Sequence, residues 1–288
     1  MDVKSAFLYG TIDEEVYVMQ PPGFHQAFPA KVYKVEKAMY GLHQAPRAWY
    51  GTLSKYLLKN GFQRGTIDQT LFIRRKREDF ILVQVYVDDT IFGSSNPQLC
   101  REFEALMHDK FQMSAMGELN FFLGLQVLQK EDGIFLSQDK YIGDILKKFG
   151  YSDVRSSNTP MDKENPWGKD GTGKDIDLHL YRSMIGSLMY LTTSRPDIMF
   201  AGHPKLGLWY PKASPFDLVA FSDSDHGGAS QDRKSTTRGS HFLGRRLISW
   251  QCKKQTIVAT STTKAEYVAA ASCCGQVMWI QNQLLDYG

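Results

Sequence analysis

The sequence predicts an α+β fold. Short apolar or alternating runs typical of strands are interspersed with segments whose apolar residues recur every three or four positions, as in helices. A two-residue connection between two of the strand-like runs predicts a β-hairpin. Residues 155–179 are rich in Gly, Pro, Asn, Asp and Lys and show no apolar period, which is typical of a linker. At about 150 residues per domain, 288 residues suggest two folded units.

The first half is predicted to contain an antiparallel sheet and two helices. Strands are expected over residues 16–19, 70–74, 80–87 and 90–92. One helix is expected from about Gln44 to a C-cap at Asn60-Gly61, because its apolar residues share one face. A second helix should begin at Pro97, since Asn96 is a good N-cap and Pro is favoured at the first helical position.

The rest of the chain is predicted to alternate in the same way. A single strand is expected over residues 121–128, followed by a helix that begins at Ser137 and ends before Gly150. A helix with an apolar face around Tyr181 to Met189 follows the linker. The last third should contain strands over 218–222, 240–243, 247–252 and 256–260 in a mixed sheet, and then a long helix from about Lys264.

Composition excludes several classes of protein. Hydrophobic residues are 42% and charged residues 23% of the chain, and 34 Lys plus Arg against 31 Asp plus Glu give a net charge of +3. This is an ordinary globular mixture, so disorder throughout the chain is excluded. The four cysteines lack the spacing of a zinc site and indicate reduced thiols. No apolar run has the length of a membrane helix, so we expect a soluble, intracellular protein without a membrane partner.

Two aspartates stand at the end of an apolar strand. Asp88-Asp89 follow Tyr86-Val87 and occupy the position of a two-residue hairpin turn. One of these carboxylates could meet a carboxylate from a neighbouring strand, and such a pair could hold two divalent ions for phosphoryl transfer. Mg²⁺, which prefers oxygen ligands, would be the natural ion. The alternative is a hairpin turn made soluble by two Asp residues, which is the commoner meaning of Asp-Asp alone.

The order of motifs resembles the reverse transcriptase of copia-type retrotransposons, in the polyprotein form common in plants. The likeness covers nearly the whole chain. It rests on Asp-Val-Lys-Ser-Ala-Phe-Leu-Tyr-Gly at 2–10, Tyr-Gly-Leu-His-Gln-Ala-Pro-Arg-Ala-Trp at 40–49, Tyr-Val-Asp-Asp at 86–89, Gly-Glu-Leu-Asn-Phe-Phe-Leu-Gly at 117–124, and the segments 181–188 and 194–198.

The resemblance implies a polymerase site. Asp2 and Asp88 would ligate two Mg²⁺ ions, with Asp89 as a supporting carboxylate. Phe7, Gln44, Tyr86 and Val87 would contact the nucleotide: Phe7 would exclude a 2′-hydroxyl, and Gln44 would contact the incoming dNTP. Each of two assignments has a plain alternative, since Phe7 could be a core aromatic and Gln44 a residue in the first turn of its helix.

The resemblance also implies partners and a reaction. An RNA template and a DNA primer would bind, and the primer 3′-hydroxyl would attack the α-phosphate of a dNTP with loss of pyrophosphate. Other segments of the same polyprotein (integrase, protease and the fingers region) would be further partners. The location would be a cytoplasmic particle or the nucleus.

A second set of residues in the last third resembles a ribonuclease H domain. Asp223, at the end of an apolar strand, and Glu266, at the start of a helix, would be its catalytic metal ligands. The alternative for Glu266 is a capping box with Thr263 at the N-cap. Lys264 stands where the family usually has Glu, and we predict no hydrolysis from this part.

The expected architecture has three parts. Residues 1–128 would be a polymerase palm without its fingers, residues 129–205 a helical thumb or connection with the linker, and residues 206–288 a truncated ribonuclease H-like α/β domain. Two functions follow. The chain is either an RNA-directed DNA polymerase segment of a retrotransposon polyprotein or a catalytically inactive relic with a nucleic-acid-binding palm.

Overall fold

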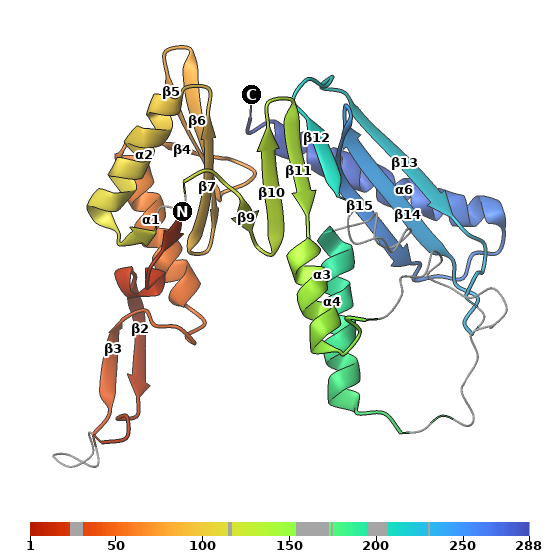
Figure 1. Ribbon diagram of the computed structural model, residues 1–288, viewed down its shortest axis with the longest axis horizontal. Helices are drawn as coiled ribbons and strands as arrows, with labels where there is room; N and C mark the ends of the chain where they lie inside the picture. The colour runs from red at the N-terminus through yellow and green to blue at the C-terminus, as the bar shows by residue number, and fades with distance from the viewer. Residues whose placement is uncertain are drawn as a thin grey trace. The chain divides into compact units, whose positions relative to one another are not determined.

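The computed structural model describes residues 1–23, 31–114, 117–153, 173, 175–194, 207–229 and 231–287. Antiparallel sheets and helices make up two compact units (Figure 1). Unit 1 comprises residues 1–118 together with 281–288, and unit 2 comprises residues 119–280. The mixed α and β character predicted from the sequence is confirmed, and the three-part division into 1–128, 129–205 and 206–288 stays a prediction.

Unit 1 is built on a six-stranded antiparallel sheet in the order β4-β5-β6-β7-β1-β8. The strands are β4 (Gln63–Arg64), β5 (Leu71–Lys76), β6 (Asp79–Tyr86), β7 (Asp89–Ser94), β1 (Asp2–Val3) and β8 (Met113–Ser114). The two-residue strand β1 pairs with β7 on one side and β8 on the other. The start of the chain is therefore an inner strand of the sheet.

Two helices pack on this sheet, α1 (Ala45–Lys59) and α2 (Pro97–Lys110). In α1 the buried Trp49, Leu53 and Leu57 recur every four residues and form one apolar stripe. The side chain of Asn96 accepts a hydrogen bond from the Gln98 backbone N–H, so Asn96 caps α2 as predicted. Both helices are confirmed within one or two residues.

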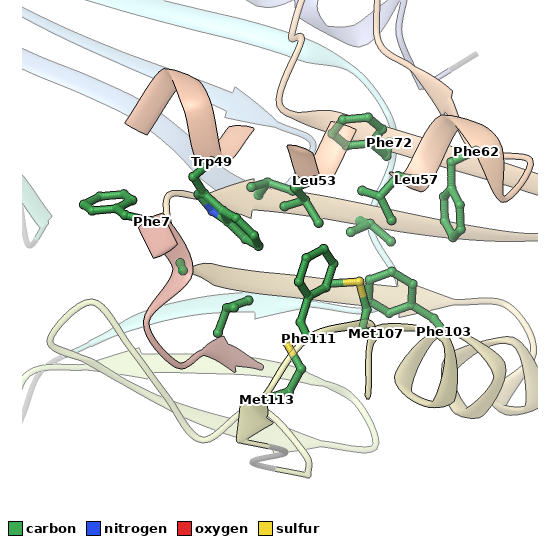
Figure 2. Close-up of a cluster of buried hydrophobic side chains, with 14 of the residues drawn as sticks. Phe7, Trp49, Leu53, Leu57, Phe62, Phe72, Phe103, Met107, Phe111 and Met113 are labelled. Carbon is green, nitrogen blue, oxygen red and sulfur yellow. The ribbon is translucent and has the colours of Figure 1, made fainter. Parts of the chain in front are cut away.

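Large apolar side chains fill the space between these helices and the sheet (Figure 2). The ring of Phe111 forms T-shaped pairs with Tyr9, Trp49 and Tyr56 at centroid distances between 5.1 and 5.4 Å. Such edge-to-face pairs add to the stabilisation from burial. A 3-10 helix, η1 (Ala6–Tyr9), and a two-stranded hairpin of β2 (Thr11–Val18) and β3 (Tyr33–Lys37) complete the described N-terminal part of unit 1.

The C-terminal residues of unit 1 dock through one carboxylate. The Asp286 side chain accepts hydrogen bonds from the backbone N–H groups of Thr66, Ile67 and Asp68 and from the Thr66 hydroxyl, at 2.7 to 2.9 Å. The Thr66 hydroxyl, assisted by the three N–H groups, lowers the pKa of Asp286 from 3.8 to about 2. The carboxylate is thus ionised at neutral pH and fixes this loop.

Unit 2 contains two smaller antiparallel sheets. One has the order β12-β11-β10-β9, with β9 (Phe121–Phe122), β10 (Leu125–Lys130), β11 (Gly133–Ser137) and β12 (Leu208–Pro211). The other joins β13 (Leu218–Ser224), β14 (Thr236–Leu243) and β15 (Arg246–Lys254). The helices are α3 (Asp139–Lys148), α4 (Leu178–Ser194) and α6 (Thr262–Leu284), whose last residues belong to unit 1.

Four expectations for this region are wrong. The strand predicted over 121–128 is a hairpin, because Leu123 and Gly124 adopt positive φ and form a two-residue turn. Ser137 ends β11, and the helix begins at Asp139. Residues 256–260 form no strand, and the described part of the β13–β15 sheet is antiparallel rather than mixed. Most of the predicted linker lies outside the described residues.

Candidate active site

The acidic hairpin between β6 and β7 turns one residue earlier than the sequence suggests. Tyr86 pairs with Asp89, so the two turn residues are Val87 and Asp88, not Asp88 and Asp89. Val87 has φ of 54°, in the left-handed region that a β-branched residue rarely adopts. Asp89 is the first residue of β7, and it pairs with Tyr86 on β6 and with Asp2 on β1.

Asp2 and Asp89 are direct cross-strand partners. Asp2 on β1 pairs with Asp89 on β7 and with Ser114 on β8. Directly opposite residues of an antiparallel pair point to the same face of the sheet. The Ser114 hydroxyl lies 3.3 Å from Asp2 Oδ2 and can donate to it. The structure therefore brings together two carboxylates that are 87 positions apart in the chain.

Asp88 is adjacent to this pair and is held through its backbone. The Val3 N–H donates to the Asp88 carbonyl at 3.0 Å. Partial burial, then the negative charges of Asp2 and Asp88, raise the pKa of Asp89. The charges of both Asp2 and Asp88 therefore act on the Asp89 carboxyl.

The residues predicted to contact a nucleotide differ in how far they are exposed. Phe7 is buried in the core, and its ring lies 4.4 Å from that of Tyr40. Burial, together with the charges of Asp88 and Asp2 and a hydrogen bond to Asp88, raises the pKa of Tyr40. Gln44 is half-buried and directly precedes α1, and its side chain makes no capping hydrogen bond. Tyr86 and Val87 are exposed at the turn.

Tyr40 and Ser114 were not assigned a role from the sequence. Tyr40 begins one of the quoted motifs, and only its neighbour Gln44 was singled out there. Ser114 lies in a two-residue strand that no local periodicity reveals. A direct signal for Ser114 would have required knowledge of the β1–β8 pairing.

The carboxylates fit a magnesium ion. Among the described residues, no group of three or more His, Cys, Asp or Glu side chains is arranged to enclose a metal by itself. Mg²⁺ does not need such a cage, since it is usually bound by one or two carboxylates, with water and substrate phosphates as the other ligands. Asp2, Asp88 and Asp89, of which Asp2 and Asp89 are directly opposite each other, offer carboxylates of this kind.

The second predicted set of carboxylates lies in unit 2. Asp223 on β13 is opposite Arg238 on β14, and their side chains form an exposed ion pair with an N–O distance of 3.0 Å. Glu266 Oε1 accepts the Ser224 N–H at 3.2 Å. The cap of α6 is Ser261, whose hydroxyl accepts the Lys264 N–H at 3.1 Å. The capping box proposed for Thr263 and Glu266 is therefore wrong, because the helix begins at Thr262.

Known proteins match the chain over its whole length. It is 34% identical over 316 aligned residues to the "Retrovirus-related Pol polyprotein from transposon RE1" and 33% identical to that from transposon RE2, both of Arabidopsis thaliana, and 30% identical to that from transposon TNT 1-94 of Nicotiana tabacum. Each alignment includes 100% of this chain but only 22% to 24% of the relative. The chain thus spans less than a quarter of the length of these polyproteins.

Shorter relatives match as well. The chain is 34% identical over 223 residues to the "Uncharacterized mitochondrial protein AtMg00810" of Arabidopsis thaliana, in an alignment that includes 68% of this chain and 92% of that protein. Within the described ranges, no helix is both long and apolar enough to cross a membrane.

Residues 1–163 match the family described as "Reverse transcriptase (RNA-dependent DNA polymerase)". On this match and on the identity to plant copia-type Pol polyproteins, the chain belongs to the reverse transcriptase family of retrotransposon polyproteins.

Proposed function

We propose that unit 1 carries the nucleotidyl-transfer site of an RNA-directed DNA polymerase and that the chain is a segment of a retrotransposon polyprotein. The observation that carries the proposal is the cross-strand pairing of Asp2 with Asp89 beside Asp88. Such like charges on opposite residues destabilise a sheet. A cationic ligand bound between the two carboxylates would remove this repulsion.

In this proposal the carboxylates position the reactants. Asp2 and Asp88 would hold Mg²⁺, with Asp89 as a supporting carboxylate. When bound, the metal would make the 3′-hydroxyl of a DNA primer a better nucleophile and stabilise negative charge on the dNTP phosphates. The hydroxyls of Ser114 and Tyr40 orient Asp2 and Asp88 respectively. The reaction forms a bond between the primer oxygen and the α-phosphate and releases pyrophosphate. An RNA template directs the choice of nucleotide.

The neighbouring aromatic residues would select the sugar. Tyr40 is more than half exposed and packs on the buried Phe7. In this proposal Tyr40, backed by Phe7, forms the wall against which the sugar lies, and Phe7 excludes a 2′-hydroxyl through this contact. Gln44, Tyr86 and Val87 contact the nucleotide and the primer end. The remaining segments of a polyprotein would complete the grip on the nucleic acid.

Primer extension on an RNA template tests the proposal. With Mg²⁺ and dNTPs, Asp88→Asn is expected to lower incorporation at least 100-fold, because the metal would lose one of its carboxylates. Asp132→Asn is the matched control, since Asp132 lies in the turn between β10 and β11 and is exposed. Equal incorporation by the parent chain and Asp88→Asn would reject the proposal and favour an inactive relic that binds nucleic acid.

We propose no hydrolytic role for unit 2. Asp223 is engaged by Arg238, and Lys264 places a positive charge two residues from Glu266. Two metal ions would have to displace these cations. Incubation with an RNA–DNA hybrid should give no cleavage above that of Glu266→Gln, and cleavage by the parent chain alone would contradict this expectation.

A further inference from the structure

The turn that carries Asp88 is held in an unfavourable backbone conformation. Val87 has φ of 54°, and only Gly and occasionally Asn or Asp adopt this region routinely. A β-branched residue there is a genuine outlier, and such outliers persist when the surrounding structure over-determines them. The neighbouring contacts should therefore include one that fixes Val87.

That contact comes from the core. The indole Nε1 of Trp49 donates a hydrogen bond to the Val87 carbonyl at 2.7 Å. Trp49 lies on α1 and is only 1% exposed. The rings of Phe111 and Tyr9 pack against the indole at 5.1 and 6.1 Å between centroids. A buried ring enclosed in this way cannot follow the turn if the turn moves.

The position of Trp49 is itself fixed by a close backbone approach. A Cβ at Gly10 would lie 2.8 Å from the Trp49 nitrogen and 2.7 Å from the Ala48 carbonyl carbon, closer than real Cβ contacts allow. Only glycine permits this contact between the end of η1 and the first turns of α1. This close approach fixes the backbone of Trp49 and therefore the position from which the indole extends.

The two turn carbonyls are thus anchored from two sides. Trp49 binds the carbonyl of Val87, and the Val3 N–H binds that of Asp88. We infer that Trp49 is a positioning residue, which holds Val87 at its positive φ and so keeps Asp88 in place next to the pair of Asp2 and Asp89. This inference rests on the proposed function for its catalytic consequence, but the anchoring itself can be measured without activity.

Trp49→Phe is the direct test, because it keeps an aromatic ring and removes the N–H donor. The turn should relax, and exchange of the Val3 amide hydrogen, which bonds to Asp88, should accelerate at least tenfold. In primer extension, kcat should fall about tenfold while the KM for dNTP changes less than threefold. Tyr56→Phe is the matched control, since Tyr56 donates from the same helix to a backbone carbonyl, that of Leu106 at 2.8 Å, away from the turn.

Restoration by a second change distinguishes positioning from loss of packing. Asn tolerates positive φ better than Val, so Trp49→Phe with Val87→Asn should recover slow exchange of the Val3 amide hydrogen. Equal Val3 exchange in Trp49→Phe and Tyr56→Phe, or no recovery in the double variant, would overturn the inference. Absence of polymerisation by the parent chain would reject the proposed function alone, because the exchange measurements still decide whether Trp49 holds the turn.

Discussion

The two units bury different kinds of side chain. Unit 1 encloses large aromatic residues, among them Trp49, Phe72 and Phe103, each with 1% or less of its surface exposed. In the described part of unit 2, the buried hydrophobic residues are small or aliphatic, and none is aromatic. Buried side-chain atoms without a hydrogen-bond partner occur in both units, on Arg74 and Thr90 in unit 1 and on Gln138, His241 and Gln255 in unit 2. Burial of such atoms costs free energy.

The difference bears on the carboxylates of each unit. Asp2 and Asp89 carry like charges on opposite residues of a sheet that packs against the aromatic core. Asp223 instead forms an ion pair with the neighbouring Arg238 on a three-stranded sheet. The opposed carboxylates of unit 1 therefore lie next to a core rich in aromatic residues, whereas Asp223 of unit 2 is paired with a cation.

The largest expected effect is on the cores themselves. Phe103→Ala should lower the free energy of unfolding by about 3–5 kcal/mol, because it leaves a cavity beside Phe62 and Phe92. Phe221→Ala in unit 2 should change it by less than about 0.5 kcal/mol, since Phe221 is 59% exposed. Urea denaturation of the full chain measures both. Equal losses would show that Phe103 contributes no more to stability than an exposed ring, contrary to its burial in unit 1.

A smaller effect is expected at the repelling pair. Asp89→Asn removes one of two like charges on opposite residues, so the metal-free chain should become more stable by about 0.2–1 kcal/mol while incorporation is lost. Solvent screening keeps the gain small because the pair is partly exposed. A loss of stability would mean that Asp89 serves the fold rather than a ligand.

The same pair gives a pH dependence of defined sign. Burial and its neighbours raise the pKa of Asp89 above 3.8 in the folded chain. The folded state therefore binds the proton more tightly, and this contribution to stability is complete below pH 3.8 and is lost as the pH rises through the folded pKa. Urea midpoints measured across that window should decline more in the parent chain than in Asp89→Asn. Asp132→Asn should retain the parent slope.

Local sequence signals predicted only part of this arrangement. The apolar stripes and end-capping residues of α1 and α2 each lie within one short segment of the chain, so both helices could be predicted. The two-residue strands β1 and β8 could not, because their pairing joins distant segments. The turn at Val87 and Asp88 was misplaced by one residue, since nothing local signals a left-handed valine. Asp2 was linked to the acidic doublet only through resemblance to a family.

The smallest effect is expected at the ion pair of unit 2. Arg238→Gln should lower stability by at most about 1 kcal/mol at low salt, because the exposed side chains of Arg238 and Asp223 attract each other across solvent. The difference should vanish near 1 M salt, where the Debye length falls to about 3 Å. Lys34→Gln, which breaks another exposed ion pair, with Glu15, is the control. A loss well above 1 kcal/mol that persists in salt would mean that Arg238 packs structurally, and the contrast with the Asp2–Asp89 pair would no longer be one of charge.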